Sequence, residues 1–181
     1  MIQSDKIDSS NMDIKKIANS VLIFSLKRLI EIIGILISCF GFLIFLALFS
    51  YSPEDPNFIF QENMNINNLI GFQGSFTSDL FFQSIGIISF LIPLTFIFTG
   101  ISLFRKKEFF LIINNLFYAV LYCLVGSLFF AFFFNETYSL YINGNGGFVG
   151  NYLNKILIGN FIRPYENILF YFLILLTSIL F

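Results

Sequence analysis

Long apolar runs separated by short polar segments dominate the pattern of this chain. Charged residues are absent from 32–53, 80–104 and 109–135, and each run can cross a bilayer as a helix, which needs about 20 residues. A fourth apolar run begins near Tyr165 and continues to Phe181. The pattern predicts an all-α integral membrane protein with four transmembrane helices arranged as two hairpins.

The expected boundaries follow from these runs. From Asn167 the fourth run offers 15 residues, about 22 Å of helix against a hydrocarbon core of about 30 Å. We therefore expect this helix to be incomplete and the chain to be a fragment of a longer protein. We expect a cytoplasmic tail at 1–28, a membrane domain at 29–181 with spans at about 29–51, 80–104, 109–135 and 165–181, and extracytoplasmic loops at 52–79 and 136–164.

The N-terminal tail admits two interpretations. Ile14, Ile17 and Val21 recur at helical spacing opposite Lys15 and Lys16, which is typical of an amphipathic helix on a membrane surface. The alternative is a solvated segment that leads into the first span. A cleaved signal peptide is disfavoured, because the first apolar run is too long and no A-x-A site follows it.

The distribution of basic residues predicts the orientation. Of the 10 Lys and Arg residues, all but Lys155 and Arg163 lie in the tail or in the Arg105–Lys107 turn. Short cytoplasmic segments carry an excess of Lys and Arg. We therefore expect the N-terminus, the basic turn and the C-terminal end in the cytoplasm, and both long loops outside.

Composition narrows the possible chemistry. Apolar residues make up 57% of the chain and charged residues 12%, against about 45–50% and about 25% in soluble domains. The chain has no His, and Cys39 and Cys123 lie in different apolar runs, which favours packing over a disulfide or a metal site. The charge-free runs 32–53, 80–104 and 109–135 place no Asp, Glu, Lys or Arg at membrane depth, which disfavours an ion path. We predict no catalytic, cofactor-binding or metal-binding residues, and a net charge of −1 predicts no direct DNA binding.

The two outer loops share a short motif. G-F-Q-G at 71–74 and G-F-V-G at 147–150 occupy matching positions, each before a partly apolar stretch, 76–82 and 152–158. The hairpins could be copies of one unit, or the match could be a coincidence. Paired glycines permit a positive φ or a close approach to a neighbouring helix. We expect a short interfacial helix after each motif, and no phosphate-binding loop, because no Lys follows the glycines.

Small residues recur along the predicted spans. Without a hydrophobic drive in lipid, helices associate through such close contacts. They predict a bundle, with partners in this chain or in a second copy, and Pro93 predicts a kink in the second span. The stripes are Gly34, Ser38 and Gly41, then Gly86, Ser89, Pro93 and Gly100, then Ala119, Cys123 and Gly126.

The first loop opens with S-Y-S-P-E-D-P at 50–56. Pro53 should end the first helix, and Asp55-Pro56 favours a turn. Contact between this acidic loop and a partner protein is the alternative role for Asp55.

These segments resemble the N-terminal membrane domain of the FtsK/SpoIIIE DNA translocases. The residues that carry the resemblance are 50–56, N-L-I-G-F-Q-G at 68–74 with Asp79, and G-G-F-V-G at 146–150. The resemblance covers the chain from about Lys27 onward. It implies a domain at the bacterial division septum that contacts other cell-division membrane proteins and the lipid bilayer, with self-association expected.

In that family a linker joins this domain to a hexameric ATPase that moves double-stranded DNA and helps segregate chromosomes. This chain lacks G-x-x-x-x-G-K-[ST] and a linker, so ATP, Mg²⁺ and DNA would be bound only by an absent C-terminal motor. The chain itself is expected to be no enzyme and to bind no cofactor. The competing hypothesis is a stand-alone four-helix protein, a small carrier or a lipid-handling protein.

Overall fold

The computed structural model describes residues 2–56, 65–134, 142–158 and 166–181, and side chains are described for 15–56, 65–134, 142–156 and 167–181. The described residues are helical and contain no strand, which confirms the all-α prediction. The elements are α1 (Ile2–Phe49), α2 (Phe72–Ile85), a 3₁₀ helix (Gly86–Phe90), α3 (Leu91–Lys106), α4 (Phe110–Phe133), α5 (Gly147–Leu153), a π-helical segment (Asn154–Ile158) and α6 (Glu166–Leu180).

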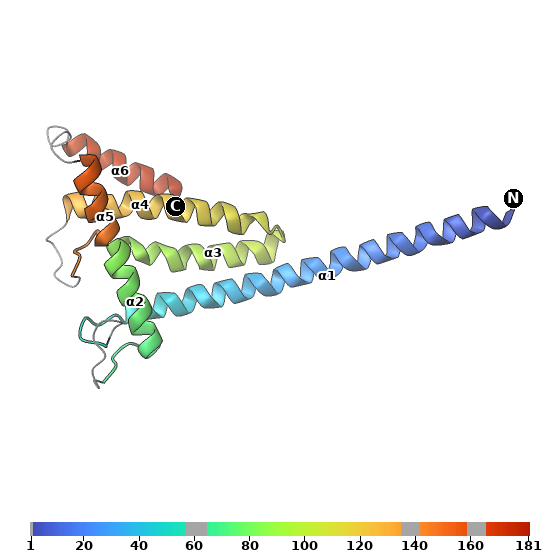
Figure 1. Cartoon of the computed structure of the whole chain (residues 1–181), viewed down its shortest axis with the longest axis horizontal. Coiled ribbons are helices and arrows are strands. Elements are labelled where there is room, and N and C mark those ends of the chain that lie inside the picture. Colours follow the sequence, from blue (N-terminus) through green and yellow to red (C-terminus); the bar gives the residue numbers. More distant parts are fainter. Residues whose placement is uncertain (1, 57–64, 135–141, 159–165) are drawn as a thin grey trace.

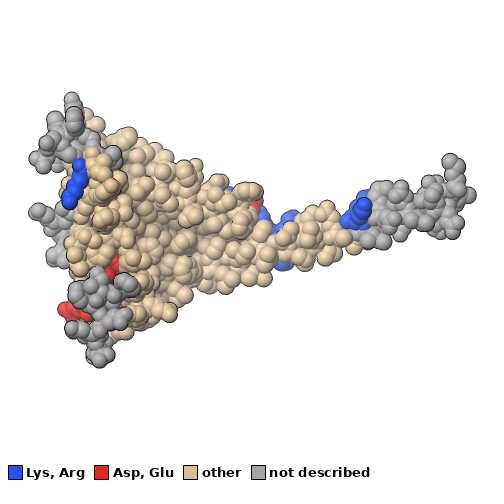
Figure 2. Space-filling model, viewed as in Figure 1, with Lys and Arg blue, Asp and Glu red and all other residues tan. Residues whose placement is uncertain are grey.

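Four helices form the body of the molecule. α1, α3, α4 and α6 lie roughly along one direction, and α2 and α5 cross the bundle at one end (Figure 1). We call that end the loop end, and the opposite end, where Lys107 joins α3 to α4, the basic-turn end. In Figure 2 the visible side of the bundle is almost entirely uncharged between these ends, and Lys and Arg gather at the narrow end and along α1.

Three helical stretches are long and apolar enough to cross a membrane. They are Lys15–Phe49, Phe72–Lys106, which includes the 3₁₀ helix, and Phe110–Phe133. Asn167–Leu180 in α6 is a shorter apolar helix. The architecture is therefore that of a helical membrane protein.

The second predicted span is not one helix from 80 to 104. The backbone breaks at Gly86, whose φ of 72° and ψ of −148° are accessible essentially only to glycine, and α2 and α3 diverge on either side (Figure 1). The prediction of a kink at Pro93 was wrong. Pro93 is the third residue of α3, in the first turn, where its missing N–H costs no helical hydrogen bond.

α1 runs through the expected boundary at residue 28 without a break. The sequence has neither glycine nor proline before Gly34, so nothing in it interrupts the helix. From Lys15 to Leu29 every side chain is exposed, and this part of α1 extends beyond the other helices (Figure 1). Its placement on a membrane surface stays a prediction.

The first two small-residue stripes meet within this chain. A Cβ on Gly34 would lie 2.7 Å from the Gly100 carbonyl oxygen, and one on Gly41 would lie 2.9 Å from the Pro93 carbonyl oxygen. Ser38 Oγ donates a hydrogen bond to the carbonyl of Ile97 at 3.1 Å. The absence of side-chain bulk thus lets the α1 and α3 backbones touch, as membrane helices require.

Candidate functional site

Asp55 joins the start of the first loop to residues further along the same loop. Its carboxylate is buried, and its two oxygens accept hydrogen bonds from the backbone N–H groups of Asn67 and Asn68, each at 2.8 Å. Asp55 also closes a turn, because its N–H donates to the Ser52 carbonyl at 3.2 Å. This turn runs from Ser52 to Asp55, so it adjoins the predicted turn at Asp55-Pro56 and does not include Pro56. The carboxylate in addition joins Asp55 to residues 12 and 13 positions further along the chain.

Asn68 satisfies the exposed carbonyl groups at the C-terminus of α1. Its Nδ2 donates to the carbonyls of Ala47 at 2.8 Å and Ser50 at 3.3 Å, and its Oδ1 accepts from the Ile70 N–H at 3.1 Å. The last carbonyls of a helix have no partner within the helix, so this amide replaces water there. Ser50 completes the contact, since its Oγ accepts from the Leu69 N–H at 3.0 Å.

The first G-F-x-G motif begins α2 next to the contact between Asn68 and the end of α1. Gly71 precedes the helix with a φ of 73°, and a side chain on Gly74 would overlap the Asn68 amide. Further along the first loop and α2, Ser75 Oγ donates to the Pro56 carbonyl at 2.9 Å, and the Tyr51 hydroxyl donates to Asp79 at 3.2 Å. The motif thus holds α2 against the end of α1.

The second loop docks onto the break between α2 and α3. The Asn145 carbonyl accepts from the Ile87 N–H at 2.9 Å and occupies the space that a Gly86 side chain would need. Asn143 meets Gln83 twice, through its N–H at 3.3 Å to Oε1 and through its Nδ2 at 3.2 Å to the carbonyl. The Asn145 side chain, fully buried, donates from Nδ2 to the Phe134 carbonyl. The glycine-rich segment therefore fills the corner of the bent second span.

The second G-F-x-G motif also begins with a positive φ and ends with a close contact, although a side chain on its first glycine, unlike one on Gly71, would overlap the backbone of Ile85 and Gly86. Gly147 has a φ of 64°, and a side chain on Gly150 would overlap the Ser127 carbonyl. Ser127 Oγ in turn donates to the Ile85 carbonyl at 2.8 Å. In each loop, then, the first glycine supplies a positive φ and the second permits contact with a neighbouring segment. Both expected roles of the paired glycines occur.

The polar side chains described at the loop end bond mainly to backbone groups. Among the described residues, no group of three His, Cys, Asp or Glu side chains could hold a metal ion. Both oxygens of Asp55 bond to backbone N–H groups of the first loop. The sequence pointed to Asp55 and to the glycines, Gly86 among them as a helix-packing residue, but it indicated no role for Asn68 or Asn145. The signal for Asn68 was present, because it opens the N-L-I-G-F-Q-G run at 68–74.

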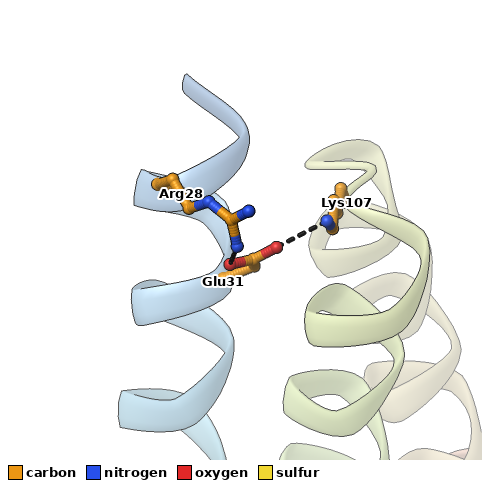
Figure 3. Close-up of polar contacts among 3 residues, drawn as sticks. All are labelled: Arg28, Glu31 and Lys107. Carbon is orange, nitrogen blue, oxygen red and sulfur yellow. Dashed lines mark hydrogen bonds and ion pairs between the residues drawn. The ribbon is translucent and has the colours of Figure 1, made fainter. Parts of the chain in front are cut away.

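An ion cluster joins α1 to the turn at the opposite end. Glu31 lies 2.6 Å from Arg28 Nη1 and 2.5 Å from Lys107 Nζ, so it bridges α1 and the end of α3 (Figure 3). Lys107 has a φ of 60°, which ends α3 and turns the chain toward α4. The cluster orients the basic turn relative to α1.

Charge reversal at Glu31 tests this bridge. Glu31→Lys places a third cation beside Arg28 and Lys107, so we expect a lower thermal unfolding midpoint in detergent. Adding Lys107→Glu restores a pair of opposite charges between α1 and the turn, so the double variant should regain part of the lost unfolding midpoint. A double-mutant cycle measures the coupling between the two positions. Strictly additive effects would show that the bridge contributes nothing.

Comparison with known proteins agrees with this architecture. Residues 26–181 match the family described as the 4TM region of DNA translocase FtsK/SpoIIIE. The DNA translocase FtsK of Rickettsia bellii (strain RML369-C) is 26% identical over 148 residues, 82% of this chain and 19% of that protein. The DNA translocase FtsK of Rickettsia prowazekii (strain Madrid E) is 41% identical over 54 residues, 30% of this chain and 7% of that protein. No solved structure matches this chain.

The apolar helices and the glycine-dependent loop contacts define a multi-pass helical membrane domain. The family match covers most of the chain, and we conclude that the chain belongs to the FtsK/SpoIIIE family as its 4TM region. The match covers less than a fifth of the length of either relative described above.

Proposed function

We propose that this chain is the membrane-anchoring and septum-assembly module of an FtsK-like DNA translocase. The family match to the membrane region of such translocases carries the proposal. In this interpretation the module acts in bacterial cell division and chromosome segregation from the inner membrane. DNA, ATP and Mg²⁺ are bound by a motor domain outside these residues, and the chain itself catalyses no reaction.

In the proposed topology α6 is the fourth span. α6 lies beside α4 and runs in the opposite direction (Figure 1), and Phe170 packs on Phe129 and Phe133 with ring centroids 5.4 Å and 5.0 Å away. The basic residues gather at the basic-turn end, which supports a cytoplasmic location for that end and for the N-terminus. The loop end then faces away from the cytoplasm, toward the septum.

The loop end is the proposed contact surface for other cell-division membrane proteins. A surface that is already ordered binds at a lower entropic cost than a flexible loop. Asn68 and Asn145 tie the two loops to helix ends by hydrogen bonds, and Asp55 closes the first loop on itself, so the loops would present such a surface. Self-association of the domain is also proposed, through the exposed apolar faces of the helices.

A localisation experiment tests the proposal. Residues 1–181 fused to a fluorescent protein should concentrate at mid-cell when expressed at native level in cells with an intact division machinery. The matched control is the same fluorescent protein on an unrelated multi-pass anchor, which should label the envelope evenly. Even labelling by both fusions would contradict a septal role.

A further inference from the structure

An apolar groove lies between α1, α3 and α4, beneath α2 and α5. Its volume is about 640 Å³, and each of these helices contributes to its wall. Among the described residues that line it, none is charged. Representative wall residues are Phe40 on α1, Phe81 on α2, Phe96 on α3, Ala119 on α4 and Val149 on α5.

The two threonine hydroxyls in the groove wall already have hydrogen-bond partners. Thr95 Oγ1 donates to the Leu91 carbonyl at 3.0 Å and lies 2.8 Å from the Tyr122 hydroxyl. Thr99 Oγ1 accepts from Asn115 Nδ2 at 2.7 Å. Because the Thr95 and Thr99 hydroxyls are already paired, an apolar occupant leaves neither of them without a partner.

Part of the third small-residue stripe creates this space. Gly126 packs closely on Ile88, but Ala119 and Cys123 line the groove. Larger side chains at these two positions would narrow it. The stripe that the sequence suggested for helix packing is therefore divided between a helix contact and a groove.

The size and shape of the groove favour a lipid tail over a protein helix. A cavity of about 150 Å³ holds one benzene, so on that scale this groove holds about 25 carbon atoms, enough for one acyl chain. A spanning helix about 10 Å wide and 30 Å long occupies about 2,400 Å³. Residues of α2 and α5 also line the groove at the loop end, where these helices cross the bundle (Figure 1). These residues of α2 and α5 would obstruct a partner helix that has to cross the whole membrane.

The charge at the basic-turn end favours an anionic headgroup. Arg105 and Lys106 are exposed, whereas Lys107 pairs with Glu31. Arg105 follows the groove residue Thr99 by six positions, which is about 9 Å along a helix. Basic residues beside a gap between membrane helices bind the phosphates of anionic lipids.

We propose that the groove binds one phospholipid from the leaflet at the basic-turn end, with an acyl chain against Ala119 and Cys123 and an anionic headgroup near Arg105 and Lys106. The proposal is independent of the septal role, because it depends only on the groove and the charges beside it. The lipid would fill the gap between α1, α3 and α4 and stabilise their arrangement.

Native mass spectrometry of the whole chain tests the proposal. Protein stripped of lipid by detergent is mixed with dioleoylphosphatidylglycerol or with dioleoylphosphatidylcholine. We expect one saturable phosphatidylglycerol adduct and weaker retention of phosphatidylcholine. Ala119→Leu should weaken the phosphatidylglycerol adduct about tenfold, because it excludes part of the chain. Ser178→Leu on the exposed side of α6 adds similar bulk outside the groove and should change nothing.

A second set of substitutions tests the contact with the lipid headgroup. Arg105→Gln combined with Lys106→Gln should reduce phosphatidylglycerol retention to that of phosphatidylcholine, whereas Lys155→Gln at the loop end should leave it unchanged. Cys123→Leu repeats the groove test if Ala119→Leu does not fold, as judged by circular dichroism. The proposal is overturned by equal retention of both lipids, by no effect of either groove variant, or by a lipid-free dimer that a groove variant converts to monomer.

Discussion

Gly86→Ala should be among the most damaging single substitutions in this chain. Gly86 combines a φ of 72° with a ψ of −148°, and an added Cβ would overlap the carbonyl of Asn145. That carbonyl accepts the Ile87 N–H, so moving it releases the second loop from the bent span. We expect the free energy of unfolding to fall by more than about 4 kcal/mol, which is an exceptionally large effect for a single substitution.

Gly71 provides a matched control for this prediction. Its φ of 73° and ψ of −154° are almost the same, yet nothing lies within 4 Å of an added Cβ. Gly71→Ala should therefore cost only the backbone strain, about 1–3 kcal/mol. Thermal unfolding of both variants in the same detergent measures the difference, with about 2–4 °C expected per kcal/mol for a chain of this size. Equal losses would show that contact with the second loop is unimportant.

Asp55→Asn should loosen the first loop. The carboxylate accepts two backbone N–H groups at 2.8 Å, whereas an asparagine turns a donor toward one of them. Because Asp55 is only 5% exposed, water cannot easily replace the lost bond. Hydrogen bonds to charged groups contribute about 1.5–3 kcal/mol, and we expect a loss of that size. Hydrogen exchange at the Asn67 and Asn68 amides should accelerate more than exchange in α4.

Glu54→Gln is the control for Asp55→Asn. It removes the same charge from the neighbouring residue, but Glu54 is exposed. It should leave both the unfolding midpoint and the exchange at Asn67 unchanged. If the two variants behave alike, the loop responds to net charge and not to the hydrogen bonds of Asp55. If the loop end is the septal contact surface, only Asp55→Asn should also reduce mid-cell fluorescence of the fusion.

The sequence identified several residues of the loop end but not the residues that they contact. A turn was expected at Asp55-Pro56, and Asp55 instead ends a turn that begins at Ser52. Its bonds to Asn67 and Asn68 depend on the first loop returning to the end of α1. The G-F-x-G motifs indicated positive φ and close approach, and both occur. Which segment each glycine approaches is not contained in the motif. Asn68 and Ser127 act through partners distant in the sequence.

Local composition and short motifs were enough to predict the apolar helical class and the family. They also predicted four spans, of which three correspond to helical stretches long and apolar enough to cross a membrane, whereas Asn167–Leu180 is shorter. The tertiary structure decided that the second span bends at Gly86 and not at Pro93. The physical reason is that a break in a helix depends on what packs against it. Here the Asn145 carbonyl fills the corner and receives the freed Ile87 N–H, whereas Pro93 lies in a first turn and disrupts nothing.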